Sequence, residues 1–164
     1  MVVVDYEFKK LIMDAHIHDT LKYCFQCNRC ADVCPVAKIE PDRYNPRKLI
    51  LASFLGWKSI ILDADDKFNI WGCTVCDTCD CVCPQHIELT EIFTVLKNMS
   101  VKRGECPEHY SAQAKAIYES GKAIPMQPAI ERRRDQLGLP KIEAPPVEEI
   151  KKILNITKLN DIIK

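Results

Sequence analysis

The sequence predicts an all-α fold made of two similar halves, followed by a proline-rich C-terminal extension. Two observations carry this prediction: a four-cysteine pattern occurs twice, and helical patterns of apolar residues follow each copy. No segment shows a convincing strand pattern. We expect the repeated domain to span residues 1–122 and the extension to span residues 123–164. The length of 164 residues suits one domain with a tail.

Helices are expected on both sides of the first cysteine pattern. Asp5 is placed to cap a helix over residues 6–17, in which apolar residues recur at helical spacing. Farther along, Asn45 is a capping residue followed by a proline, and Gly56 is a typical helix end. This predicts a helix between them. Residues 57–72 give no clear pattern.

A strong amphipathic helix is expected after the second cysteine pattern, over residues 90–103. Its apolar stripe consists of Ile92, Val95, Leu96 and Met99. A further helix should start near Pro107 and end near Gly121. Shorter helices over residues 131–137 and 147–155 lie among the prolines of the extension. We expect this extension to pack on a partner protein, with disorder as the alternative for the last residues.

The cysteine patterns have the form Cys-x2-Cys-x2-Cys-x3-Cys-Pro and cover residues 24–35 and 73–84. This run is typical of ferredoxins that hold two 4Fe–4S clusters, where the fourth cysteine ligates the other cluster. The sequence therefore predicts two 4Fe–4S clusters surrounded by helices. The ligands of the first are expected to be Cys24, Cys27, Cys30 and Cys83. Those of the second are expected to be Cys73, Cys76, Cys79 and Cys34. This exchange makes cluster assembly part of folding.

The cysteines allow two other interpretations. A disulfide framework would suit a small secreted protein, but the N-terminus turns acidic at Asp5 and lacks the features of a signal peptide. Zinc sites generally use two Cys-x2-Cys pairs, rather than three evenly spaced cysteines and a Cys-Pro. The doubled pattern therefore favours iron–sulfur clusters.

Composition argues against several classes of function. The 23 basic and 23 acidic residues give a formal net charge of zero, whereas nucleic-acid-binding proteins carry a basic surface. No apolar run approaches the ~20 residues of a membrane span. Reduced cysteines favour a cytoplasmic location. Because no nucleotide-binding loop or nucleophile–base arrangement is evident, we expect no catalytic residue on this chain.

Other residues could act near the clusters. Cys81, inside the second pattern, is expected to be a small packed residue, with ligation as the alternative. Cys106 is expected to be a partly buried thiol, although a helix N-terminus could make it reactive. Five basic residues near the first pattern could raise a cluster potential, form a docking surface or be solvated: Lys22, Arg29, Arg43, Arg47 and Lys48. Four histidines are expected to be structural or superficial: His16, His18, His86 and His109.

Four stretches of the sequence resemble the C subunit of heterodisulfide reductase from methanogens. They are Cys24–Pro35, Tyr44–Lys48 with its Tyr-Asn-Pro-Arg, Trp71–Cys76, and Cys83–Gln85 with the helix that continues to Gly104. The resemblance covers about residues 20–125 and implies an α-helical ferredoxin fold.

The resemblance also implies a role as an electron relay. In that family a flavin-containing A subunit bifurcates electron pairs, and the C subunit passes single electrons through two clusters. The electrons reach a cysteine-rich B subunit, which reduces the mixed disulfide of coenzyme M and coenzyme B in methanogenesis. A hydrogenase or formate dehydrogenase module supplies them. Three alternatives stay open: a relay subunit of another anaerobic dehydrogenase (glycerol-3-phosphate or lactate type), a free ferredoxin, and a structural zinc protein.

Overall fold

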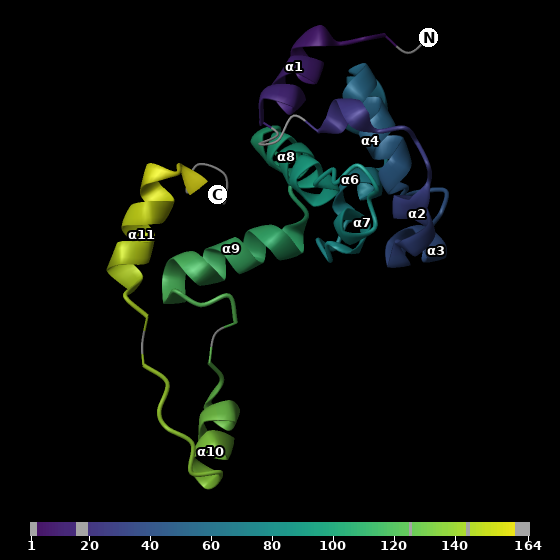
Figure 1. Cartoon of the computed structure of the whole chain (residues 1–164). Helices are drawn as coiled ribbons and strands as arrows, with labels where there is room; N and C mark the ends of the chain where they lie inside the picture. The colour runs from purple at the N-terminus through teal and green to yellow at the C-terminus, as the bar shows by residue number, and fades with distance from the viewer. Residues whose placement is uncertain (1–2, 16–19, 125, 144, 160–164) are drawn as a thin grey trace. The chain divides into compact units, whose positions relative to one another are not determined.

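The computed structural model describes residues 3–15, 20–124, 126–143 and 145–159, and within them it contains helices and no strand (Figure 1). The predicted all-α class is therefore confirmed. The chain divides into two compact units, Met1–Arg103 and Gly104–Lys164. Within the described residues, no helix is long and apolar enough to cross a membrane. The end of the ferredoxin domain, expected at residue 122, stays a prediction.

The first unit consists of short helices around the cysteines and longer helices that carry the core. In chain order they are α1 (Tyr6–Ala15), the 3-10 helix η1 (Leu21–Tyr23), α2 (Arg29–Val33), α3 (Pro35–Ile39), α4 (Pro46–Leu55), α5 (Lys58–Ile61), α6 (Phe68–Trp71), α7 (Thr78–Cys81) and α8 (Leu89–Lys102).

The ends of α1 and α4 follow from their capping residues. The Asp5 carboxylate accepts a hydrogen bond from the Phe8 backbone N–H (2.9 Å), as expected for the N-cap of α1. The predicted end of this helix at residue 17 lies outside the described residues. Gly56 ends α4 in the left-handed conformation (φ 72°), and a Cβ there would lie 2.7 Å from the Asp5 carbonyl oxygen. A glycine is therefore required at this close approach.

Replacing Asn45 by alanine is expected to destabilise the first unit by about 1 kcal/mol, the usual value for loss of an N-cap. The Asn45 side-chain oxygen accepts a hydrogen bond from the Lys48 backbone N–H at 3.1 Å. Chemical denaturation without oxygen would measure the change, with Asn45→Asp as a matched variant that keeps the acceptor. Equal losses for both variants would contradict the capping role.

Helix α8 lies at the centre of the hydrophobic core of the first unit. It packs against α1, α4, α6 and α7, and its residues Ile92, Phe93 and Leu96 are almost completely buried. The Phe93 ring makes an edge-to-face contact with the buried Tyr44 ring, with 6.5 Å between centroids. The predicted stripe was correct for Ile92 and Leu96, which are buried, and for Met99, which is partly buried against the core, but it omitted Phe93.

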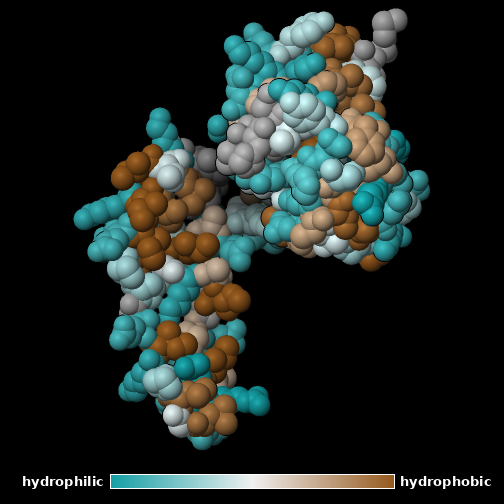
Figure 2. Space-filling model, in the orientation of Figure 1, coloured by the Kyte–Doolittle hydropathy of each residue, from teal (hydrophilic) through white to brown (hydrophobic). Residues whose placement is uncertain are grey.

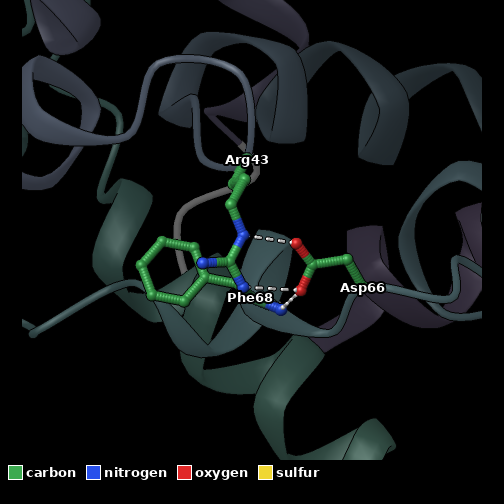
Figure 3. Close-up of polar contacts among 3 residues, drawn as sticks. All are labelled: Arg43, Asp66 and Phe68. Carbon is green, nitrogen blue, oxygen red and sulfur yellow. Dashed lines mark hydrogen bonds and ion pairs between the residues drawn. The ribbon is translucent and has the colours of Figure 1, made fainter.

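The segment 57–72, which gave no clear pattern, forms α5 and α6, and a charged contact lies at the start of α6 (Figure 3). Arg43 Nε and Nη2 donate to the Asp66 carboxylate at 2.6 and 3.1 Å, and the Arg43 guanidinium lies over the Phe68 ring. These bonds, with one from the Phe68 backbone N–H, lower the pKa of Asp66 to about 2. A lowered carboxyl pKa stabilises the fold above pH 3.8, and the effect is lost as the pH falls towards 2.

The second unit contains α9 (Glu108–Ser120), α10 (Pro128–Gln136) and α11 (Val147–Ile156). Helices were predicted close to all three positions. Helix α9 packs against α11, whereas much apolar surface of this unit is exposed (Figure 2). The exposed large apolar side chains among its described residues are Tyr110, Ile124, Ile130, Leu137, Leu139, Ile142, Ile153 and Ile156.

Candidate iron–sulfur site

The two cysteine patterns form loops that each lead into a short helix. Cys24 and Cys27 lie before α2, which contains Cys30, whereas Cys73 and Cys76 lie before α7, which contains Cys79. Helices α2 and α7 pack against each other. The two patterns are therefore adjacent in space, although about fifty residues separate them in the sequence.

The two loops share an uncommon backbone conformation. Gln26 and Asn28 have φ angles of 60° and 72°, and the residues at the equivalent positions, Val75 and Asp77, have 53° and 57°. Residues other than glycine rarely adopt positive φ, and Val75, with its branched side chain, is especially disfavoured there. The repeat seen in the sequence is therefore also a repeat of backbone structure, with strain of the kind found at functional sites.

Each predicted ligand set lines one cavity. Cys24, Cys27, Cys30 and Cys83 line the first cavity together with Gln26, Asn28, Arg29, Arg47, Ile50, Pro84, Ile87 and Leu89. Cys34, Cys73, Cys76 and Cys79 line the second cavity together with Val36, Tyr44, Pro46, Thr74, Thr78 and Thr90. The fold thus brings each fourth cysteine to the three cysteines of the other half. The ligand role itself stays a prediction.

Backbone and side-chain donors point at several of these sulfurs. The Cys24 Sγ accepts from Gln26 Nε2 at 3.2 Å. Backbone N–H groups donate to the sulfurs of Cys34 (3.5 Å), Cys73 (3.4 Å) and Cys83 (3.4 Å). Donors of this kind stabilise negative charge on sulfur, so the surroundings suit thiolates bound to iron.

The cysteines differ in exposure in the same way in both loops. The middle cysteines, Cys27 and Cys76, are exposed, whereas the other six predicted ligands are partly or completely buried. Burial raises the pKa of Cys30 to about 11, and burial together with the Asp80 carboxylate raises the pKa of Cys79. A hydrogen bond with Thr78 lowers the pKa of Cys76. Metal binding must therefore displace protons from the buried thiols.

Within the described residues, no group of three Cys, His, Asp or Glu side chains converges on a single metal-ion position. A four-iron cluster places its four thiolates on four separate iron atoms, so its ligands surround a cavity rather than a point. The two four-cysteine cavities therefore have the arrangement of ligands that a four-iron cluster needs.

The remaining cysteines and histidines do not line either cavity, as far as the described residues extend. Cys81 is exposed on α7, so the prediction that it packs as a small buried residue was wrong. Cys106 is partly buried and burial raises its pKa, which agrees with the expected unreactive thiol. His86 and His109 are exposed, and His16 and His18 lie outside the described residues.

The basic residues near the first pattern separate into different environments. Arg29 and Arg47 line the first cavity, whereas Arg43 pairs with Asp66 and the Lys22 ammonium lies over the Tyr23 ring. Lys48 lies on the surface, away from both cavities. Position in the sequence alone could not separate these roles.

The sequence reasoning also missed a buried cation beside the second cavity. The Lys97 ammonium donates to the Cys73 carbonyl oxygen at 2.6 Å, although it lies on the buried face of α8. Because Lys97 lies four residues after Phe93, both side chains lie on one face of the helix, and this spacing was the sequence signal that could have predicted its burial.

Comparisons with known proteins agree with this site. Residues 20–87 match a family model described as a 4Fe-4S dicluster domain. The fold and the match define an iron–sulfur protein of the electron-transfer class.

Relatives that match most of the chain give the particular family. The chain is 30% identical to the second iron–sulfur C subunit of the CoB–CoM heterodisulfide reductase of Methanocaldococcus jannaschii over 163 residues, which cover 96% of this chain and 84% of the relative. It is 31% identical to a protein of Archaeoglobus profundus that is named as similar to the heterodisulfide reductase C subunit, over 88% of this chain and 77% of the relative. The C subunit of the H(2):CoB-CoM heterodisulfide,ferredoxin reductase of Methanothermobacter marburgensis is 29% identical to this chain, over 98% of this chain and 86% of the relative. The chain belongs to the family of heterodisulfide reductase iron–sulfur C subunits.

Proposed function

We propose that this chain is the electron-transfer subunit of a heterodisulfide reductase complex and that it holds two 4Fe–4S clusters. The observation that carries the proposal is the grouping of eight cysteines into two cavities, each with three cysteines from one half and one from the other. Each bound cluster would accept and release one electron at a time.

The residues of the chain have three tasks in this function. The eight cysteines hold the clusters, and the amide donors at their sulfurs stabilise the negative charge. The contact between α2 and α7 keeps the two cavities adjacent. The exposed Cys27 and Cys76 leave one corner of each cavity open to a partner, so one side can receive electrons and the other can deliver them.

Partner proteins would supply and consume the electrons. We assign the donor side to a flavin-containing A-type subunit and the acceptor side to a cysteine-rich B-type subunit that reduces the disulfide of coenzyme M and coenzyme B. The names of three relatives include H2, and one of these names also includes formate, so a hydrogenase or formate dehydrogenase module is the proposed source of electrons here. We place the complex in the cytoplasm and the disulfide chemistry on the B-type subunit.

The C-terminal extension is proposed to pack on one of these partners. Seven large apolar side chains among the described residues of the extension are exposed, which is the pattern expected of a surface that a partner covers.

The proposal is tested by isolating the chain with its native partners without oxygen and identifying them by mass spectrometry. A flavoprotein together with a cysteine-rich subunit, and about eight iron atoms per chain, is the expected result. Recovery of a different dehydrogenase, or of an unaccompanied monomer, would refute the named complex. Zinc in place of iron would refute the relay altogether.

A further inference from the structure

The two cavities are related by the internal repeat, but their charged side chains differ. Arg29 and Arg47 line the first cavity, and no Asp or Glu side chain is among its described lining residues. The second cavity has no Lys, Arg, Asp or Glu among the described residues of its lining. The position equivalent to Arg29 is Thr78. Arg47 and Thr90 are likewise equivalent, because each is the second residue of its long helix.

Arg47 is held where it could interact with a group inside the first cavity. Its side chain is partly buried, and its Nε is completely buried with no hydrogen-bond partner within the described part of the chain. A buried donor without an acceptor costs about 1–3 kcal/mol. Sulfur atoms in the first cavity would supply the missing acceptor. Arg29 is exposed, so solvent weakens its effect.

Thr90 is engaged differently at the equivalent position of the second cavity. Its backbone N–H donates to Asp80 Oδ1 at 3.2 Å, and its hydroxyl donates to Asp80 Oδ2. The same carboxylate lies 3.5 Å from the Cys79 sulfur. A negative group therefore contacts a predicted ligand of the second cavity, whereas a positive group lines the first.

The positive charge of Lys97 offsets only part of this difference in charge between the two cavities. Its ammonium bonds to the backbone carbonyl of Cys73, so one positive and one negative group lie beside the second cavity. The first cavity has two cations in its wall. Asp32, which accepts a hydrogen bond from the lining residue Asn28, offsets one of these cations, so the net charge around the two cavities differs by about one, in favour of the first.

From this asymmetry we propose that the cluster of the first cavity has the higher reduction potential, that Arg47 sets the difference, and that electrons pass from the second cavity to the first. Reduction adds negative charge, so a nearby cation and a donor to sulfur stabilise the reduced form. This inference rests on the proposed function and adds to it the direction of electron transfer between the two clusters. The second cavity then faces the electron donor, and the first faces the acceptor.

Redox titration of the iron-loaded protein without oxygen, followed by electron paramagnetic resonance, tests the proposal. Cys27→Ser and Cys76→Ser, each altering one exposed predicted ligand, assign the two signals to their cavities. Arg47→Gln is expected to lower the potential of the first cavity alone. At a fixed applied potential, the ratio of reduced to oxidised cluster should fall at least tenfold, which is about 59 mV for one electron. Lys48→Gln is the matched control, because it removes an exposed charge next in sequence.

Several outcomes would overturn the proposal. They are a higher potential for the signal assigned to the second cavity, equal shifts of both signals with Arg47→Gln, and an equal effect of Lys48→Gln. If Arg47→Gln loses iron, Arg47→Lys, which keeps the charge, replaces it in the titration. The order of the two potentials in the unmodified protein then still tests the proposal. A correct order in a chain that binds none of the expected partners would uphold the charge effect and refute the named complex.

Discussion

Replacing Cys83 by alanine is expected to remove the cluster of the first cavity and about half of the bound iron. Cys83 belongs to the second cysteine pattern, yet it lines the cavity of Cys24, Cys27 and Cys30. Removing it therefore leaves three ligands around that cavity and all four around the other. Since metal binding contributes directly to folding in such sites, the variant should also unfold at a lower temperature.

Iron analysis and electron paramagnetic resonance would measure the effect of Cys83→Ala, with Cys81→Ala as the matched control. Cys81 lies two residues away, is exposed and does not line either cavity, so its replacement should leave the iron content unchanged. If Cys81→Ala lost the iron and Cys83→Ala kept it, the assignment of the fourth ligand would be wrong. If Cys83→Ala removed the signal that Cys76→Ser alters, the exchange between halves would be wrong.

The sequence predicted those features of the fold that depend on neighbouring residues. The starts of α1 and α4 were predictable because Asp5 and Asn45 bond to backbone N–H groups three residues later. The long α8 was predictable from its apolar periodicity. The helices α5 and α6 were not, because each has only four residues and depends on tertiary contacts such as Arg43 with Asp66.

The grouping of the cysteines could be predicted, but their surroundings could not. The spacing of the cysteines alone predicted two sets of four ligands. The fold places each predicted set around one cavity. The left-handed conformation of Val75 is opposite to the preference of a β-branched residue, so no local rule predicts it. The positions of Arg47 and Lys97 depend on how α4 and α8 pack around the loops, and this is a property of the whole first unit.

Replacing Phe93 by alanine is expected to give the largest loss of stability among core substitutions on α8, about 3–5 kcal/mol. The Phe93 side chain is 1% exposed and contacts the Tyr44 ring, which lines the second cavity. Its removal would leave a cavity in the core and would also loosen the wall beside the second ligand set. A total stability of about 5–15 kcal/mol is usual, so the loss would be a large fraction of it.

Thermal unfolding of the iron-loaded protein without oxygen, at one heating rate, would measure the Phe93→Ala effect. At about 2–4 °C per kcal/mol for a chain of this size, we expect the midpoint to fall by about 6–20 °C. Asn98→Ala is the matched control, because Asn98 lies on the exposed face of the same helix and its replacement should change stability little. The second cavity should also release its iron before the first, since Tyr44 lines the second alone. Equal unfolding midpoints for the two variants would mean that α8 does not lie at the centre of the core. Simultaneous release of iron from both cavities would mean that Tyr44 does not couple the core to the second ligand set.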